Sequence, residues 1–473
     1  MNIGLLTLYL LFTVWAVFSV IMYGSRPTKS LGWILTIFIF PFGGPILYYL
    51  FGVNRRKFKL FRRNRYLNRV NLDQKETYTK TEELTDFGDH INFRSLAFLL
   101  KNAAKEYPTA GNDITVLHNG AETFKALFSS MEKAEKFIHL QYYIFEKGKL
   151  QDKLYELFQK KIQEGVEIRL IYDSFGSFFF RGKRKQRFLD LGVELHPIMP
   201  IRFGNFLFSL NYRNHRKIVI IDGVLGFTGG INISDKYVSN KDELGRWRDV
   251  HVRLAGPSVN RLHQVFLRDY YHSSKGQSLF TDEYLPKQEK SGEAIVQIVS
   301  SGPDSKFPSV MMQYVAMINQ AQNEICICNP YFIPGETVLH AVKMAALKGI
   351  KVKLLVPQKS DSILAKYGMY SNFEDLLEAG VDIYLRKDFT HSKLIIIDKD
   401  LVSVGSGNFD FRSFEHNFET NALLFHKKTA HEVLKDFDQH VANAKKLSYD
   451  TFKRRPGYKK FFEGVAKFFA PLL

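Results

Sequence analysis

The sequence predicts an α/β protein of two similar lobes, each a mixed or mainly parallel β-sheet flanked by helices, preceded by two N-terminal transmembrane helices. One observation behind this prediction is an apolar, β-branched run that occurs twice, at 218–221 and 394–397, with similar residues on both sides. A second is the alternation of amphipathic helical stretches with strand-like runs around both copies, which is typical of α/β lobes. The third is a pair of uncharged stretches, residues 3–23 and 30–54.

The first uncharged stretch, residues 3–23, has the length of a transmembrane helix. As a helix it spans about 30 Å, the thickness of a bilayer core. Its flanking residues lack the basic start and the small-residue cleavage site of a signal peptide, so we expect a retained anchor. The second stretch, 30–54, is interrupted at 41–45 by two prolines and two glycines, which predicts either a kinked spanning helix or a re-entrant segment.

Basic residues gather directly after the second stretch. No acidic residue interrupts this cluster, whereas the loop between the two stretches offers only Arg26 and Lys29. The positive-inside rule therefore predicts a multi-pass protein of the cell membrane whose long remainder is cytoplasmic. We also expect the cluster to bind anionic lipid headgroups. Its members are Arg55, Arg56, Lys57, Lys59, Arg62, Arg63, Arg65 and Arg69.

Composition restricts the class of protein further. The chain has 473 residues, of which 45% are hydrophobic, so it can bury sizeable cores and is not a disordered scaffold. Its 66 Lys and Arg against 48 Asp and Glu give a formal charge of +18, which predicts an anionic partner, either nucleic acid or an acidic membrane surface. Cys326 and Cys328 alternate with isoleucines in a strand-like run, so we expect buried thiols and neither a disulfide nor a zinc site.

Changes of composition along the chain predict where its parts begin and end. An acidic, proline-containing stretch separates the two repeats, and a basic, phenylalanine-rich segment closes the chain. We expect an anchor at 1–54, a basic juxtamembrane linker at 55–110 with a short helix from 93 to 104, a first lobe at 111–282, a linker at 283–293, and a second lobe at 294–473 with a basic amphipathic tail. The tail is expected either to lie at a membrane interface or to dock on the lobe.

Each lobe contains one copy of a short polar motif, His-x-Lys-x4-Asp, followed by a glycine-containing turn and an asparagine. The histidine and the asparagine are 17 residues apart in both copies, which a chance match of one short motif would not produce. Two half-sites are therefore predicted. The candidate catalytic residues are His215, Lys217, Asp222, His391, Lys393 and Asp398, and the asparagines are Asn232 and Asn408.

The residue types of the motif suit the chemistry of a phosphate ester. Histidine and lysine two positions apart on a strand lie on one face. A lysine neutralises phosphate oxygens, one histidine attacks phosphorus, and the other protonates the leaving oxygen, so no metal and no cofactor is needed. The aspartate lies seven positions from the histidine, an odd offset that points it to the other face, where it more plausibly fixes the following turn.

These twin motifs resemble those of the phospholipase D superfamily, and within it the bacterial cardiolipin synthases. The segments 247–249 (Trp-Arg-Asp) and 329–334 (Asn-Pro-Tyr-Phe-Ile-Pro) are similar beyond the motif itself. The resemblance implies two phospholipase D-like lobes that transfer a phosphatidyl group from one phosphatidylglycerol to another, with release of glycerol and a phosphatidyl-histidine intermediate. It favours His215 as nucleophile and His391 as acid/base, a choice that the sequence alone leaves open.

The resemblance also implies supporting residues around the two histidines. Asp249 and Glu419 stand at comparable positions after the two motifs, and in this family such acids orient the histidines; an ordinary surface or turn role is the alternative. Tyr143 and Tyr331 end corresponding strands and are expected in the pocket wall. Arg412 is expected to bind a second phosphate, unless it is an ordinary helix-surface arginine.

The chain departs from the family pattern and from its own internal symmetry in a few places. Gln141 stands where cardiolipin synthases usually have an acid, and Tyr270 with Tyr271 where they usually have an Asp-Trp pair. The first lobe carries 12 more residues before its histidine than the second, and this extra segment contains Phe203, Phe206, Leu207 and Phe208. We expect these side chains either to pack on the lobe or to contact lipid acyl chains. A basic and aromatic loop at 175–187 is expected to contact the membrane interface, because a solvated charge run would not need its three phenylalanines.

Several other functions share the motif. They are phospholipase D hydrolysis, transfer to another headgroup alcohol, a nuclease, and a non-enzymatic scaffold that binds anionic lipid. A nuclease does not need two apolar N-terminal segments, and a relict scaffold is not expected to keep both complete motifs. The expected partners are therefore phosphatidylglycerol and anionic membrane lipids, not nucleic acid, and the oligomeric state is left open.

Overall fold

The computed structural model describes residues 3–24, 27–52, 87–200, 212–239 and 244–470. It divides into one unit built on residues 1–79 and a second unit that contains both lobes. Each unit is described by itself. The basic cluster at 55–69 and the extra segment with Phe203, Phe206, Leu207 and Phe208 lie outside the described residues.

The N-terminal unit contains one long helix and a shorter, broken one. Its elements are α1 (Ile3–Tyr23), α2 (Pro27–Ile39), α3 (Gly44–Leu47) and the π-helical turn η1 (Tyr48–Gly52). Within the described part of the chain, α1 is the one helix that is long and apolar enough to cross a membrane. Ala16, Val20, Ile37 and Tyr48 form a small apolar core among these elements.

The second apolar stretch turns back on itself. Tyr9 of α1 donates a hydrogen bond to the carbonyl of Pro41, and Ser19 of α1 lies 2.9 Å from the hydroxyl of Tyr48. Tyr9 and Ser19 are about 15 Å apart along a helix. Pro41 lies beside Tyr9 and Tyr48 beside Ser19, so between Pro41 and Tyr48 the chain runs back along α1 over most of the distance that α2 had covered. The 13 residues of α2 span about 20 Å, too short for a bilayer core of about 30 Å. The expectation of two spanning helices is not confirmed, and the unit has the form of the re-entrant alternative.

Each lobe has a mixed sheet flanked by helices, as expected, and the two sheets join into one sheet of 15 described strands. The first lobe contributes β1 (Thr109–Leu117), β2 (Phe137–Tyr142), β3 (Glu167–Asp173), β4 (Glu194–Ile198), β5 (Ile218–Ile221), β6 (Leu225–Gly229) and β7 (His251–Ala255). The second contributes β8 (Ala294–Ser301), β9 (Glu324–Cys328), β10 (Lys351–Pro357), β11 (Asp382–Arg386), β12 (Leu394–Ile397), β13 (Leu401–Gly405), β14 (Glu419–Phe425) and β15 (Lys445–Lys446).

The strand order repeats the internal duplication of the sequence. In the first lobe it is β1-β7-β6-β5-β2-β3-β4, and in the second the same order recurs as β8-β14-β13-β12-β9-β10-β11. The antiparallel pairing of β1 with β8 joins the two halves, through Asn112 opposite Ala294. The expected α/β class and the duplication are confirmed, and the halves are related by an approximate twofold symmetry at this junction.

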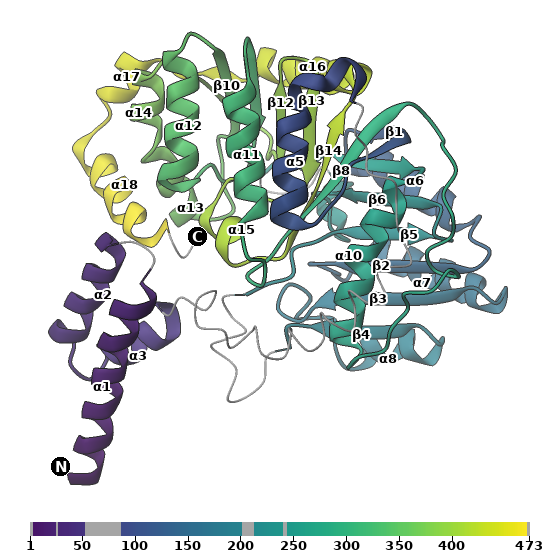
Figure 1. The fold of residues 1–473 in the computed structure, drawn as a ribbon, viewed down its shortest axis with the longest axis horizontal. Helices are drawn as coiled ribbons and strands as arrows, with labels where there is room; N and C mark the ends of the chain where they lie inside the picture. The colour runs from purple at the N-terminus through teal and green to yellow at the C-terminus, as the bar shows by residue number, and fades with distance from the viewer. Residues whose placement is uncertain (1–2, 25–26, 53–86, 201–211, 240–243, 471–473) are drawn as a thin grey trace. The chain divides into compact units, whose positions relative to one another are not determined.

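Helices cover the sheet of each lobe (Figure 1). The first lobe has α6 (Gly120–Met131), α7 (Lys149–Gln163), α8 (Lys183–Asp190) and α10 (Ser258–Ser273), with a 3-10 turn η4 (Asp235–Tyr237). The second has α11 (Ser309–Gln320), α12 (Gly335–Leu347), α13 (Ile363–Tyr370), α14 (Phe373–Glu378), α15 (Phe411–Glu415), α16 (Lys427–Ala442), α17 (Tyr449–Lys453) and α18 (Gly457–Phe469). The 3-10 helix η3 (Gly88–Phe93) leads into α5 (Arg94–Ala104), which packs on the second lobe as the sequence predicted a helix from 93 to 104.

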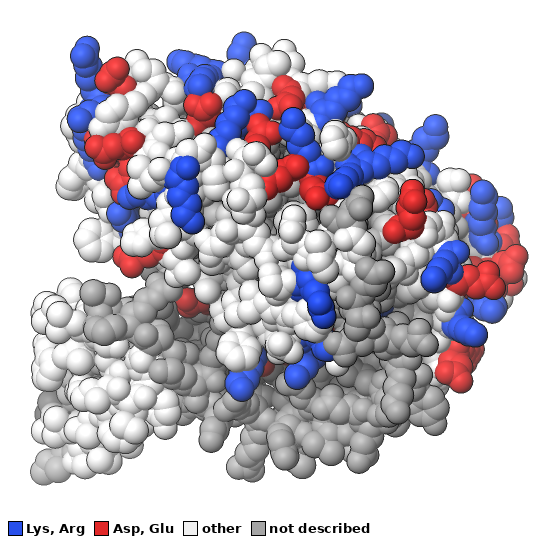
Figure 2. All heavy atoms as spheres, turned by 45° about the horizontal axis from the view of Figure 1, so that its top comes forward, with Lys and Arg blue, Asp and Glu red and all other residues white. Residues whose placement is uncertain are grey.

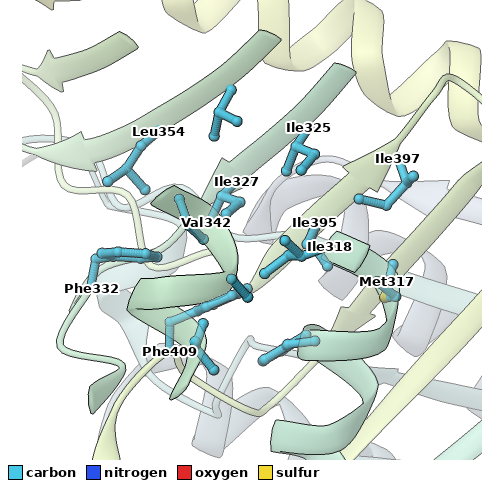
Figure 3. Packing of buried hydrophobic residues seen from close by; sticks show 14 of the residues in the cluster. Met317, Ile318, Ile325, Ile327, Phe332, Val342, Leu354, Ile395, Ile397 and Phe409 are labelled. Carbon is cyan, nitrogen blue, oxygen red and sulfur yellow. The ribbon is translucent and has the colours of Figure 1, made fainter. Parts of the chain in front are cut away.

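Each lobe has its own hydrophobic core. In the second lobe Ile325 and Ile327 of β9 pack with Ile395 and Ile397 of β12 under the helices (Figure 3). Cys326 and Cys328, on the other face of β9, are buried and free, as predicted. Basic and acidic side chains are interspersed over the face of the lobes shown in Figure 2, so the net positive charge is not gathered there.

Candidate active site

The two motif histidines precede the strands at the centre of each half of the sheet. His215 lies shortly before β5 and His391 shortly before β12, and each strand is antiparallel to a neighbour, β2 or β9, whose carboxyl end reaches the same edge. The two lobes are bridged at this edge. The backbone N–H of His215 donates to the carbonyl of Phe418, 2.9 Å away, and that of His391 donates to the carbonyl of Arg248, 2.6 Å away.

Each histidine is paired with the acid of the opposite lobe. Nδ1 of His215 lies 3.0 Å from Oε2 of Glu419, which begins β14 of the second lobe. Nδ1 of His391 lies 2.7 Å from Oδ2 of Asp249, which precedes β7 of the first lobe. The sequence predicted that the two acids orient the histidines, but it did not predict this exchange between lobes.

The surroundings of His215 specify its tautomer. Besides Glu419, the carbonyl of Ser406 lies 3.1 Å from Nδ1. Both partners only accept hydrogen bonds, so we assign the hydrogen of the neutral imidazole to Nδ1. Nε2 then carries the lone pair. Burial and the positive charge of Lys217 lower the pKa of His215, although Glu419 has the opposite effect. The lowered pKa keeps the ring neutral.

Glu419 is held by several donors. Its oxygens accept hydrogen bonds from Ser406 (2.5 Å), Ser413 (3.0 Å) and Asn417 (3.3 Å), in addition to His215. Burial by itself raises the pKa of a carboxyl group, but the hydrogen bonds from His215 and Ser406 and the charge of Lys217 outweigh this effect, and the pKa of Glu419 is lowered. Glu419 is therefore an ionised, rigidly placed partner for His215.

His391 has a different set of neighbours. Besides Asp249, the hydroxyl of Tyr237 (3.1 Å) and Nζ of Lys393 (2.8 Å) lie near its Nδ1. One ring nitrogen carries either a hydrogen or a lone pair, so these contacts cannot all be hydrogen bonds at once; we assign the bond to Asp249, the shortest contact and a charged acceptor. Burial raises the pKa of Asp249 to about 6, which leaves it ionised at neutral pH.

The motif lysines are fully buried beside their histidines. Nζ of Lys217 donates to the carbonyl of His215, 2.6 Å away, and Nζ of Lys393 donates to the carbonyl of His391. Burial lowers the pKa of Lys217 well below its usual value and also lowers that of Lys393. An anionic group bound between them offsets this cost of burial, so the arrangement favours an anionic ligand.

Aromatic rings enclose the two histidines unequally. The ring of Tyr143 lies edge-on to His215, with centroids 4.9 Å apart. His391 has three aromatic neighbours, Trp247 (5.6 Å), Tyr237 (6.0 Å) and Phe389 (6.2 Å). The equivalent of Phe389 in the first lobe is Arg213, whose guanidinium forms a buried ion pair with Asp173 at 3.1 Å. The two half-sites are therefore chemically different.

The structure places the motif aspartates away from the histidines, so their inclusion among the candidate catalytic residues is not supported by their position. Asp222 and Asp398 stand at the opposite ends of β5 and β12, about 23 Å from the histidines along an extended chain. Asp222 accepts backbone N–H bonds from residues 135, 136 and 137 (2.8–2.9 Å), and Asp398 from residues 322, 323 and 324 (2.7–2.8 Å). Both also adopt a positive φ, 53° and 51°, in the turns that follow the strands. These contacts are those of residues that fix a turn, the interpretation that the odd offset favoured.

The remaining predicted site residues differ in their burial and in their hydrogen-bond partners. Asn232 accepts from the backbone N–H of Ile144 at 3.2 Å, while the side-chain oxygen of Asn408 is buried without a partner among the described residues. Tyr331 donates its hydroxyl to Asp361, 2.7 Å from both carboxylate oxygens. Arg412, near the start of α15, is half-buried.

Sequence reasoning missed several neighbours of the histidines and of their acids, such as Tyr237 beside His391 and Ser413 beside Glu419. Tyr237 follows Asn232 by five positions, and Ser413 follows Asn408 by five, so the duplicated spacing was a usable signal. Trp247 was recognised as part of a specific segment but not as a neighbour of His391. Its indole N–H is buried without a partner among the described residues.

The departure from the family pattern at Gln141 has a local explanation. The amide of Gln141 donates to Oδ2 of Asp269 at 2.5 Å, and Asp269 also accepts two 2.7 Å bonds from Arg216. An acid at position 141 would place a second carboxylate against Asp269, whereas the amide supplies a donor. Arg216 extends from this cluster to Ser300 of the second lobe at 2.6 Å, so the network also joins the lobes.

A duplicated α/β body with one His-Lys half-site in each lobe, closed by acids exchanged between the lobes, defines a phospholipase D-like protein. A family model described as the PLD-like domain of cardiolipin synthase matches residues 127–269 and 314–441, and one described as the phospholipase D-nuclease N-terminal region matches 11–52. A cardiolipin synthase of Geobacillus sp. is 37% identical over 97% of this chain and 92% of its own length. A probable cardiolipin synthase of Bacillus subtilis is 37% identical over 99% of this chain and 94% of its own length.

Solved structures support the same fold. The crystal structure of phosphatidylserine synthase from Haemophilus influenzae aligns with a TM-score of 0.61 over 80% of this chain and 97% of its own, at 15% identity, which shows a shared fold alone. The chain belongs to the cardiolipin synthase family of phospholipase D-like proteins.

Proposed function

We propose that this chain is a cardiolipin synthase that transfers a phosphatidyl group from one phosphatidylglycerol to another and releases glycerol. The observation that carries the proposal is the pair of histidines, each hydrogen-bonded through Nδ1 to a carboxylate of the opposite lobe. This arrangement leaves both Nε2 atoms for phosphate chemistry, and relatives along nearly the whole chain are cardiolipin synthases.

In the first step, Nε2 of His215 attacks the phosphorus of one phosphatidylglycerol. A P–N bond forms, the P–O bond to glycerol breaks, and His391 gives its Nε2 proton to the departing oxygen. His215 is assigned as nucleophile by the family resemblance, and the two acceptors at its Nδ1 support this role because they leave a lone pair on Nε2. Lys217 and Lys393 neutralise the phosphate oxygens.

In the second step, His391 takes the proton from a terminal hydroxyl of the second phosphatidylglycerol. The resulting oxygen attacks phosphorus, the P–N bond to His215 breaks, and cardiolipin leaves. Burial and the charges of Lys393 and Lys217 lower the pKa of His391 well below its usual value, so this histidine is neutral in the empty site. The negative charge of the bound phosphodiester raises the pKa of His391 again, so proton uptake by His391 is coupled to substrate binding.

We also propose a membrane arrangement for the chain. Helix α1 crosses the cell membrane once, residues 27–52 enter and leave on the cytoplasmic side, and both lobes are cytoplasmic. Arg26, Lys29 and the basic cluster at 55–69 then all lie on the same, cytoplasmic side, which agrees with the positive-inside rule. This replaces the multi-pass arrangement expected from the sequence.

Product analysis tests the proposed reaction. The full chain in detergent is incubated with phosphatidylglycerol that carries label in both glycerol moieties, and lipids and water-soluble products are separated. Cardiolipin and free glycerol in equal amounts are expected. Phosphatidic acid as the main product would identify a hydrolase, and a new phospholipid formed only when another alcohol is added would identify transfer to a different headgroup; either result would reject the proposal.

A further inference from the structure

The C-terminal helix α18 turns its small side chains toward the lobe and its large apolar ones toward solvent. Ala466 and Ala470 are buried, whereas Phe461 and Phe468 are 68% and 86% exposed. A surface helix of a water-soluble domain does the opposite, because burial of phenylalanine removes far more apolar area from water than burial of alanine. The exposed apolar residues are Tyr458, Phe461, Phe462, Val465, Phe468 and Phe469, which recur at helical spacing.

A buried ion pair holds α18 in this orientation. Glu463, on the inward face, accepts from Arg455 at 2.6 Å, and the same guanidinium reaches Glu374 of α14 at 2.5 Å. The ring of Phe462 also lies 5.8 Å from that of Tyr367 in α13. Rolling the helix to bury its phenylalanines would break the Arg455 network, so their exposure is a property of the fold and not of a loose tail.

The apolar surface continues from α18 onto the start of α13, where Ile363 is 77% exposed and Leu364 is also exposed. Two residues before Ile363, Asp361 accepts the hydroxyl hydrogen of Tyr331. Tyr331 lies three residues beyond the end of β9, at the edge of the sheet where the histidines lie. The exposed surface of the second lobe therefore borders the site.

The first lobe carries an equivalent exposed group beside the site. Phe175, Phe178 and Phe179 are exposed, and the guanidinium of Arg181 lies 4.2 Å above the ring of Phe178. This loop is attached to the site because Ser177 donates to the carbonyl of Tyr143, whose ring contacts His215. Exposed aromatic groups thus occur next to both half-sites.

We propose that α18 with the start of α13, together with the loop at 175–181, is a docking surface for an anionic lipid bilayer. Lys459, Lys460 and Lys467 of α18 are exposed beside the phenylalanines, and a helix with aromatic and lysine residues in this arrangement suits an interface of acidic headgroups. Docking here turns the site toward the bilayer. This consequence rests on the proposed function: the substrate phosphate then reaches the histidines without withdrawal of its acyl chains, which costs about 0.8 kcal/mol per CH₂.

Depth-dependent fluorescence tests the docking. The full chain with Phe468→Cys, labelled with an environment-sensitive fluorophore, is reconstituted into phosphatidylcholine vesicles that contain phosphatidylglycerol, with and without a spin-labelled lipid quencher. Leu347→Cys is the matched control, since Leu347 is 73% exposed and ends α12, whose other end faces the site. The native cysteines are buried and need no replacement. We expect a blue-shifted emission and strong quenching at 468 and neither at 347.

Equal quenching at the two positions, or none at either, would overturn the inference. A blue shift at 468 without quenching by the spin-labelled lipid would also overturn it, because the helix would then be covered by protein, either a second copy or another part of the chain. The readout does not depend on catalysis. Quenching at 468 in a protein that makes no cardiolipin would support docking and reject the proposed function. Cardiolipin formation without quenching would support the proposed function and reject docking.

Discussion

The carboxylate of Glu419, in the second lobe, lies 3.0 Å from Nδ1 of His215, in the first lobe. The corresponding contact, from Oδ2 of Asp249 in the first lobe to Nδ1 of His391 in the second, measures 2.7 Å. Neither lobe therefore contains a complete half-site, because the carboxylate that binds the histidine of each lobe comes from the other lobe. Backbone hydrogen bonds at both histidines and the pairing of β1 with β8 also join the two lobes.

The exchanged acids provide the first prediction. Glu419→Gln removes the charge that fixes the Nδ1–H tautomer of His215 at nearly unchanged volume, so the turnover rate should fall by about 10²-fold or more while the thermal unfolding midpoint changes little. Adding His215→Ala to Glu419→Gln should lower the rate little beyond His215→Ala alone, since Glu419 acts through that histidine. Steady-state rates and thermal melts of the three variants check this. A Glu419→Gln enzyme with wild-type rate would reject the orienting role.

The second prediction separates the roles of the two histidines. Both His215→Ala and His391→Ala should lose at least about 10²-fold in turnover on phosphatidylglycerol. On a phosphatidyl ester of p-nitrophenol, which leaves without acid catalysis, His391→Ala should still release a burst of nitrophenolate equal to the enzyme present, and His215→Ala should release none. A burst from His215→Ala and none from His391→Ala would reverse the assignment. A single variant that keeps more than about a tenth of the normal rate would refute the two-histidine mechanism.

The third prediction concerns metals. Lys217 and Lys393 are placed to supply the positive charge that a divalent ion would bring to a phosphate, so activity should survive EDTA. Within the described residues there is also no group of three or more His, Cys, Asp or Glu placed to hold an ion. Turnover before and after extensive EDTA treatment is the measurement. Complete loss that one divalent ion restores would contradict the prediction.

The fourth prediction distinguishes the re-entrant anchor from a two-helix hairpin. Single cysteines at Asn2, Ser30 and Ser273 are probed on intact cells with a thiol reagent that does not cross membranes. With one spanning helix, only the cysteine at position 2 should react, because residues 24–30 return to the cytoplasmic side with the lobes. A hairpin of two spanning helices predicts the opposite pattern at positions 2 and 30. Ser273 controls for cell lysis, and its labelling in sealed cells would place the lobes outside.

The fifth prediction concerns stability in acid. His139 and His263 are buried together, with ring nitrogens 2.8 Å apart, and burial lowers the pKa of His139 well below its usual value and that of His263 to about 3. Both stay neutral in the folded protein but gain a proton in the unfolded chain below pH 6.5. The contribution of these two neutral histidines to the free energy of unfolding is therefore fully present above about pH 6.5. Below that pH it falls by about 1.4 kcal/mol per pH unit for each histidine.

Chemical denaturation of two histidine variants measures this effect. His263→Gln should show a shallower loss of the denaturation midpoint between pH 7 and pH 5 than the unchanged protein. His431→Gln, at an exposed histidine of α16, is the matched control and should keep the original pH dependence. Equal pH dependence in the His263→Gln variant and the unchanged protein would show that this buried pair does not govern acid stability.

The sequence by itself determined the duplication, the α/β class and the two His-Lys pairs, whereas the supporting acids were expected from the family resemblance. The first three are local or periodic properties. A histidine and a lysine two apart in extended chain lie on one face, and the equal spacing of 17 residues from histidine to asparagine in both copies indicates the same strand and turn twice. The buried thiols followed from the same alternation.

The tertiary structure alone decided which acid meets which histidine, where the motif aspartates point, and how the second apolar stretch returns. Each depends on contacts between residues far apart in the chain, 204 positions in the case of His215 and Glu419, and no local periodicity encodes such a pairing. The same is true of α18. Its composition indicated an interfacial tail, but only the packing of Glu463 and Ala466 against the lobe determines that its phenylalanines face outward.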